Sequence, residues 1–229
     1  LKKRKILKNY KNINIKYIDK KENYIGNPKI YKFLNFGETG TNLNNNLYFS
    51  LVNKVIEENN FKNIIEIGGG YGNLCSLIKS HFKECVYNII ELPGSSLVCL
   101  YYLENYFRNI YKVNFLLDEK IKINFNNNEI NIIPFNNLLS GELDFPENTT
   151  ILNTQSFQHM NEKTIKLYLN IFKRNNVKTI ISLNRDIPAK SSEVDYSKIF
   201  EKNNYKLSNK ILLNCINNHF YFKIFKSFN

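Results

Sequence analysis

The sequence has no run of eighteen apolar residues, the length that a membrane-spanning helix requires, so it predicts no transmembrane segment. No apolar stretch of the kind that marks a secretory signal peptide follows its basic N-terminus. Only four of the 229 residues are cysteine, and no two of them form a C-x-x-C pair. This pattern disfavours a structural zinc site and favours reduced, buried thiols in a cytoplasmic protein.

Acidic residues are scarce at the N-terminal end of the chain. Residues 1–32 contain eleven lysines or arginines against Asp19 and Glu22, a local net charge of +9 out of the total of +12. The basic character therefore belongs to an N-terminal arm. Such an arm suits a phosphate-bearing substrate, RNA, an acidic partner or a membrane surface, and it is equally the composition of a solvated tail.

The whole chain has 43% hydrophobic and 14% aromatic residues, which is typical of a globular domain. We divide the sequence into a basic arm over residues 1–45 and a domain over residues 46–229. Within the arm, the stretch 37–40 (Gly-Glu-Thr-Gly) forms either part of a lid over a substrate, with the glycines as hinges, or a simple turn.

The spacing of apolar residues predicts alternating helices and strands along the domain. Helices are predicted at 48–58, 73–82, 95–107 (with Ser95 as its N-cap) and 162–174. Strands are predicted at 61–67, 85–92, 112–117, 120–125, 129–135, 149–154 and 178–183, with 120–125 and 129–135 forming a hairpin. Two longer strands, at 205–215 and 219–225, form an antiparallel pair. The prediction is an α/β fold: a doubly wound, mostly parallel sheet with a C-terminal antiparallel hairpin and a basic N-terminal extension.

A glycine cluster, Gly68, Gly69, Gly70 and Gly72, follows the strand at 61–67. Ligands of a doubly wound sheet bind at the carboxyl ends of its strands, where glycine permits a sharp turn and a close approach of the backbone. The dinucleotide pattern G-x-G-x-x-G fails here because Asn73 occupies its last position, and no Gly-Lys-Ser/Thr phosphate loop occurs. The cluster by itself leaves several nucleotide cofactors open.

Two carboxylates narrow the choice of cofactor. Glu66, two residues before the first glycine, would repel a pyrophosphate but attract the ammonium and sulfonium groups of S-adenosylmethionine. Glu91, at the end of the next strand, stands where an acidic residue takes the ribose hydroxyls of a bound nucleoside. The sequence therefore favours S-adenosylmethionine.

The spacing E-x-G-x-G-x-G together with Glu91 resembles the Rossmann-type S-adenosylmethionine-dependent methyltransferases, and more closely their sugar O-methyltransferase family. The segments that carry the resemblance are 65–73, 90–93, 101–103, 153–161 and 182–185. They lie within a little over half of the chain. The sequence departs from the family's pattern at two positions, where Glu91 replaces Asp and His159 replaces Glu.

The resemblance implies a set of site residues. The cofactor would be bound by Glu66, Gly68, Gly69, Gly70, Tyr71, Gly72, Glu91, Leu92 and Asn153, with Phe135 and Asn136 beside the adenine. The acceptor would be bound by Gln155, Ser156, Gln158, Asn184 and Arg185. Other roles stay open for three kinds of residue: packing for Tyr71, helix capping for the glutamines and Ser156, and a structural salt bridge for Arg185.

Methyl transfer is an in-line displacement, and a sugar hydroxyl is a poor nucleophile at neutral pH, so a general base near the acceptor assists it. His159 is the candidate base, since it lies in the loop after the fourth strand of the fold; a surface or helix-capping histidine is the alternative. Asn153 stands where a metal-dependent enzyme would have an aspartate, so we expect no metal ion.

The predicted function is the O-methylation of a sugar hydroxyl on a nucleotide-linked sugar or a glycan precursor, a small-molecule or glycan acceptor that can bear phosphate. A nucleic-acid methyltransferase is one alternative, favoured by the basic arm but disfavoured because 153–156 lacks the Asn-Pro-Pro-Tyr/Phe signature. A non-catalytic, cofactor-binding partner subunit is another. The sequence leaves a homo-oligomer open.

Overall fold

The computed structural model of the 229-residue chain describes residues 25–26, 31–33, 36–38, 40–117, 126–139, 143–185, 194–213 and 220–228. A short antiparallel pair, β1 (Tyr31–Phe33) and β2 (Phe36–Glu38), precedes the long helix α2 (Gly40–Asn59). Most of the basic arm therefore lies outside the described residues, as do Cys215 and His219.

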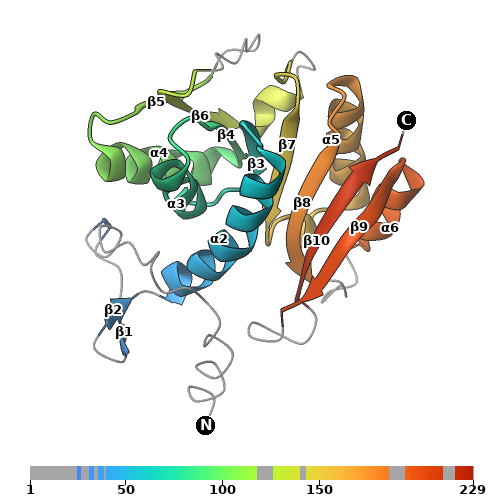
Figure 1. The fold of residues 1–229 in the computed structure, drawn as a ribbon. Coiled ribbons are helices and arrows are strands. Elements are labelled where there is room, and N and C mark those ends of the chain that lie inside the picture. The colour runs from blue at the N-terminus through green and yellow to red at the C-terminus, as the bar shows by residue number, and fades with distance from the viewer. Residues whose placement is uncertain are drawn as a thin grey trace.

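A twisted sheet forms the centre of the protein, with strand order β5-β6-β4-β3-β7-β8-β10-β9 in the described part of the chain (Figure 1). Parallel neighbours run from one edge to β8: β5 (Lys112–Phe115), β6 (Glu129–Pro134), β4 (Val86–Glu91), β3 (Asn63–Ile67), β7 (Thr149–Thr154) and β8 (Thr179–Arg185). The two last strands, β10 (Phe220–Ser227) and β9 (Tyr205–Leu212), are antiparallel, and β10 lies between β8 and β9. The predicted doubly wound sheet with an antiparallel C-terminal pair is confirmed.

Helices cover both faces of this sheet. On one face α2, α3 (Asn73–His81) and α4 (Pro93–Phe107) enclose a core that includes Phe49, Leu77 and Ile89. On the other face α5 (Glu162–Arg174) and α6 (Tyr196–Lys202) enclose a second core that includes Ile151 and Phe172. Burial on both faces explains why the parallel strands are near-continuous runs of isoleucine and leucine.

Two helix starts differ from the sequence prediction, and one short helix was not predicted. Helix α2 begins at Gly40 instead of at residue 48, so the arm boundary at residue 45 falls inside a helix. Its first two turns are rich in asparagine, a weak helix former, and have only Leu43 and Leu47 as apolar residues. Helix α4 begins at Pro93, with Leu92 and not Ser95 at the N-cap, because proline suits the first helical position. The seven-residue α6 was not predicted, since it is too short for its period to stand out.

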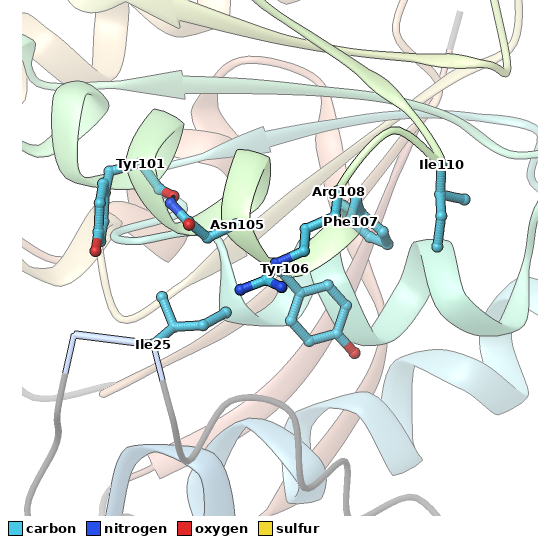
Figure 2. Close-up of a pocket in the computed structure, with 7 residues that line it drawn as sticks. All are labelled: Ile25, Tyr101, Asn105, Tyr106, Phe107, Arg108 and Ile110. Atoms are coloured by element: carbon cyan, nitrogen blue, oxygen red, sulfur yellow. Dashed lines mark hydrogen bonds between the residues drawn. The ribbon is translucent and has the colours of Figure 1, made fainter.

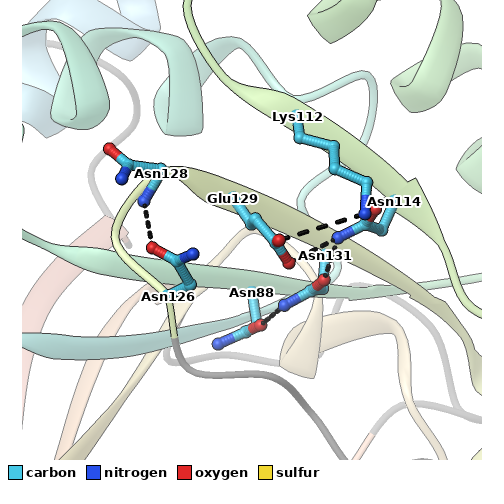
Figure 3. Close-up of polar contacts among 7 residues, drawn as sticks. All are labelled: Asn88, Lys112, Asn114, Asn126, Asn128, Glu129 and Asn131. Carbon is cyan, nitrogen blue, oxygen red and sulfur yellow. Dashed lines mark hydrogen bonds and ion pairs between the residues drawn. The ribbon is translucent and has the colours of Figure 1, made fainter.

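The predicted hairpin before β6 cannot be compared directly, because residues 120–125 lie outside the described part of the chain. Strand β6 instead pairs in parallel with both β4 and β5. Asparagine side chains connect these three strands in one row (Figure 3). Asn131 donates to Asn88 at 2.7 Å, and Asn114 donates to Asn131 at 2.9 Å and to Glu129 at 2.9 Å. Asparagine, which marks turns elsewhere in this sequence, here supplies paired amides inside the sheet, where buried polar groups need partners.

Candidate functional site

The glycine loop connects the carboxyl end of β3 to α3. Gly68, Gly70 and Gly72 have φ values of +72°, +58° and +92°, in the left-handed region that glycine adopts without strain. The Gly68 N–H donates to Ile90 O at 2.8 Å, which ties the loop to the end of β4. The sequence-predicted turn at the carboxyl ends of the strands is therefore present, with its backbone at the start of a helix.

The loop is packed tightly at Gly68 and open at Gly70. A Cβ atom on Gly68 would lie 2.2 Å from Ser156 Oγ and 2.4 Å from Ser156 Cβ, so the loop after β7 rests directly on this residue. A Cβ atom on Gly70 would meet no heavy atom of the described residues within 4 Å. The space beside the Gly70 peptide is therefore open, whereas Ser156 fills the space beside Gly68.

This difference predicts unequal effects of alanine. We expect Gly68→Ala to lower the free energy of unfolding by about 3 kcal/mol or more, because it adds a clash to an unfavourable φ. Gly70→Ala has only the unfavourable φ, and we expect a loss of about 1–2 kcal/mol. Urea unfolding followed by circular dichroism measures both. Ser156→Gly should recover part of the loss in Gly68→Ala; equal losses for the two alanine variants would contradict the packing described here.

Glu91 stands at the end of β4 and contacts the glycine loop. Its Oε2 accepts the Gly70 N–H at 2.5 Å, and its Oε1 accepts the Leu92 N–H at 2.7 Å. Burial raises the pKa of this carboxyl, and the two backbone hydrogen bonds oppose that rise. Each carboxylate oxygen has a second lone pair, so Glu91 can accept further hydrogen bonds from hydroxyl groups.

Glu66 lies beneath the loop. It is completely buried, and its Oε2 accepts the Tyr87 hydroxyl at 2.9 Å, while its Oε1 has no hydrogen-bond partner among the described residues. The pKa of Glu66 is raised to about 8 because burial disfavours the carboxylate; the Tyr87 hydrogen bond opposes this rise and the charge of Glu91 adds to it. At neutral pH the free protein therefore holds Glu66 mainly as the neutral acid.

The loop after β7 is held by a buried amide network. Asn153 donates to Ile67 O at 2.7 Å, and its Oδ1 accepts from the Phe157 N–H at 3.0 Å and from Asn184 at 2.8 Å. Asn184 also donates to Ser182 Oγ at 2.8 Å. Both asparagine side chains are fully buried, and their hydrogen bonds join the ends of β3, β7 and β8.

Gln155, Gln158 and His159 occupy the same loop. Gln155, at a φ of +56°, donates its side-chain amide to the Tyr48 hydroxyl of α2. Gln158 is almost fully buried, with its Oε1 accepting the Arg185 N–H at 2.8 Å and its Nε2 lying 3.0 Å from His159 Nε2. Phe157 lies edge-on to Phe200 of α6, with ring centroids 5.2 Å apart. This contact holds the loop after β7 against the second core.

A cleft of about 260 Å³ lies between the glycine loop, the end of β4 and the start of α5. Six predicted site residues line it: Gly68, Glu91, Leu92, Phe135, Ser156 and His159. Five further lining residues were not predicted: Ile90, Met160, Asn161, Thr164 and Tyr168. Thr164 and Tyr168 are four residues apart, which places them on one side of α5, so the helical spacing of the sequence could have indicated these two.

The remaining predicted residues are not in the lining of this cleft. Tyr71 lies edge-on to Tyr102 of α4, with ring centroids 4.8 Å apart, and packs against the first core. Asn136 is exposed in the 3-10 turn η4 (Phe135–Leu138), next to the lining residue Phe135. Arg185 ends β8, where its N–H meets Gln158.

A larger hollow of about 460 Å³ lies elsewhere, at the C-terminal end of α4 (Figure 2). It is lined by Ile25, Tyr101, Asn105, Tyr106, Phe107, Arg108 and Ile110. Among the described residues that line it, none belongs to the glycine loop and none has a carboxylate side chain. We therefore take the smaller cleft, which joins the glycine loop to Glu91, as the candidate site.

Two further observations concern the described residues. None of the helices there is long and apolar enough to cross a membrane. In the same part of the chain, no three His, Cys, Asp or Glu side chains are grouped so that they could hold a metal ion.

No family model matches the chain, and no curated protein matches its sequence. Solved structures do match its fold. The mitomycin 7-O-methyltransferase MmcR has a TM-score of 0.53 at 11% identity, over 82% of this chain and 57% of that one. The methyltransferase domain of bacterial CtHen1 has a TM-score of 0.56 at 14% identity, over 82% of this chain and 100% of that one. The O-methyltransferase segment of StiE has a TM-score of 0.53 at 14% identity, over 77% of this chain and 72% of that one.

The chain spans only 57% of the length of MmcR and 58% of that of the pyocyanin biosynthetic protein PhzM. At these low identities the likeness concerns the fold alone. The protein has the Rossmann-type methyltransferase fold.

Proposed function

We propose that this protein is an S-adenosylmethionine-dependent methyltransferase that O-methylates a small-molecule hydroxyl. The observation that supports it best is the pairing of an open glycine backbone with a carboxylate at the end of the neighbouring strand, Gly70 with Glu91 at 2.5 Å. This pairing occurs within a fold shared with O-methyltransferases such as MmcR.

The residues around the cleft fit this cofactor. Glu91 can accept hydrogen bonds from ribose hydroxyls, as carboxylates do at this position in nucleotide-binding sheets. Ile90, Phe135 and Tyr168 offer apolar and aromatic surface to an adenine ring. Gly70, whose missing side chain leaves free space, permits close approach to the loop. When bound, the cofactor would supply a methyl group activated by a positively charged sulfur.

The chain's own contribution would be to hold the acceptor in line and to manage its proton. As the acceptor oxygen bonds to the methyl carbon, the carbon–sulfur bond breaks with its electron pair going to sulfur, and the hydroxyl proton must pass to a base. His159 lines the cleft and is our proposed base. In this structure the Gln158 side-chain amide contacts His159 Nε2. That contact would have to break before Nε2 could take a proton from the acceptor.

Cofactor binding can be measured by calorimetry. We expect S-adenosylmethionine and its demethylated product to bind, and Glu91→Gln to weaken that binding about 10- to 100-fold through loss of charge-assisted hydrogen bonds. Glu104→Gln, at an exposed position on α4, serves as the control and should bind like the wild type. Absence of binding to the wild-type chain would overturn the proposed function.

The acceptor we propose is a sugar hydroxyl, on a nucleotide-linked sugar or a glycan precursor. This finer assignment is supported by the family resemblance of segments 153–161 and 182–185, and the basic arm would suit an acceptor with a diphosphate. Transfer of a labelled methyl group to a panel of nucleotide sugars, with total RNA as the comparison, tests it. Label in RNA would favour the nucleic-acid alternative, and cofactor binding without transfer to any acceptor would favour a non-catalytic partner subunit.

A further inference from the structure

The side chain of Gln158 bridges β8 and His159. Its Oε1 lies 2.8 Å from the Arg185 main-chain nitrogen, and its Nε2 lies 3.0 Å from His159 Nε2. Gln158 is only 6% exposed, so these two contacts define the surroundings of its amide. The geometry bears on the protonation of the histidine ring, which lines the cleft.

Hydrogen-bond chemistry permits one arrangement of this bridge. A main-chain N–H can only donate, so the Gln158 atom that faces Arg185 must be the oxygen. The atom that faces His159 is therefore the amide nitrogen, which can only donate. His159 Nε2 then accepts a hydrogen bond, so in the neutral ring it carries no hydrogen, and the ring hydrogen is on Nδ1.

We propose that Gln158 is a positioning residue that fixes neutral His159 in the tautomer with its hydrogen on Nδ1. The lone pair of the neutral ring is then the one that Gln158 covers. His159 can accept a proton from an acceptor hydroxyl only when that hydroxyl takes the place of the Gln158 amide at Nε2. This last step rests on the proposed function, whereas the tautomer itself does not.

The main chain at Gln158 is held in place, and a flipped side-chain amide would be unfavourable there. The Gln158 main-chain N–H donates to Asn184 Oδ1 at 3.3 Å, and the preceding Phe157 N–H donates to Asn153 Oδ1 at 3.0 Å. Phe157 is fully buried in the second core. A flipped amide would place its NH₂ group against the Arg185 N–H and leave two donors facing each other, which is unfavourable in a buried site.

The tautomer can be observed directly by NMR. The chain contains three histidines, so ¹⁵N-histidine labelling of the full chain gives a simple long-range ¹H–¹⁵N spectrum, and His159→Ala identifies the signals of His159. At about pH 8.5, two units above the ordinary imidazole pKa of about 6.5, an unperturbed ring is neutral. We expect His159 to show hydrogen on Nδ1. In Gln158→Glu the carboxylate keeps an acceptor for Arg185 but offers His159 an acceptor too, so the hydrogen should move to Nε2.

Gln155→Glu is the matched control, because it adds the same charge to the same loop on a side chain that contacts Tyr48 instead. Its His159 tautomer should equal that of the wild type. A wild-type spectrum with hydrogen on Nε2 would overturn the proposal, and so would an unchanged tautomer in Gln158→Glu. If Gln158→Glu does not fold, Gln158→Leu replaces it, because leucine removes the donor that faces Nε2 and should end the preference for hydrogen on Nδ1. Calorimetry with S-adenosylmethionine on the same wild-type sample separates the two proposals. Absent binding with the expected tautomer would overturn the proposed function alone.

Discussion

Glu66→Gln should make the protein more stable than the wild type above about pH 6, by an amount that increases up to about pH 8. The pKa of Glu66 is about 8 in the folded protein, against an ordinary value of 4.5, because its carboxyl is completely buried. The folded state therefore holds this proton more tightly than the unfolded chain. Stability from this group is fully present below pH 4.5 and is lost as the pH rises to about 8.

The difference between the two pKa values corresponds to a change in the free energy of unfolding of at most about 5 kcal/mol. Glutamine resembles the protonated acid, can still accept the Tyr87 hydrogen bond, and never ionises. Free energies of unfolding at several values between pH 4.5 and 8.5 measure the difference between the two proteins. Glu57→Gln, an exposed position on α2, is the control and should change stability equally at every pH. A Glu66→Gln difference that does not vary with pH would contradict the raised pKa.

Lys79→Met should lower the free energy of unfolding by about 3–5 kcal/mol. The Lys79 ammonium group donates to three main-chain oxygens, those of Lys83 at 3.0 Å, Cys85 at 2.7 Å and Asn127 at 2.7 Å. It also lies 4.2 Å from the centre of the Tyr111 ring. Methionine fills a similar volume but leaves these carbonyls without a donor.

Burial lowers the pKa of Lys79, but the three acceptors use every hydrogen of the ammonium group. The contacts join the end of α3 to the start of β4 and to the turn before β6, so we expect the loss to affect the whole sheet edge. Urea unfolding of Lys79→Met measures this loss, and the control is urea unfolding of Lys54→Met. The Lys54 side chain is exposed on α2 and forms an ion pair with Glu58, with 3.8 Å between Nζ and Oε1. That control should change stability by at most about 0.5 kcal/mol. If Lys79→Met lowers the free energy of unfolding by less than about 1 kcal/mol, the three hydrogen bonds of the ammonium group do not contribute as predicted.

Local patterns in the sequence predicted most of the elements. The helix at 162–174 matches α5 residue for residue, because its apolar side chains recur at helical spacing between Asn161, which caps it, and the asparagine that ends it. The glycine turn after β3 and the carboxylate ending β4 were also predicted, since both depend on residue type at a fixed distance from a strand. Helix α6 and the first two turns of α2 were missed, because α6 is only seven residues long and the start of α2 has few apolar residues among its asparagines.

The composition of the site depended on the arrangement of strands in space. Asn153 and Asn184 were predicted to contact ligands, but the pairing of β7 with β8 brings them to each other, and their amides are used within the protein. Tyr48 was predicted only as a helix residue, yet it meets Gln155 across 107 positions of sequence. Spacing along a chain cannot show whether a polar side chain at a strand end faces a cleft or a neighbouring amide.

The chemistry of individual residues was likewise decided by their surroundings. The sequence alone established that a carboxylate precedes the glycines and that a histidine follows β7, since residue identity and element order are local properties. It could not reveal that Glu66 lies under the loop with a raised pKa, or that the His159 ring meets the Gln158 amide. Protonation depends on burial and on hydrogen-bond partners from other strands, and only the folded sheet brings those partners together.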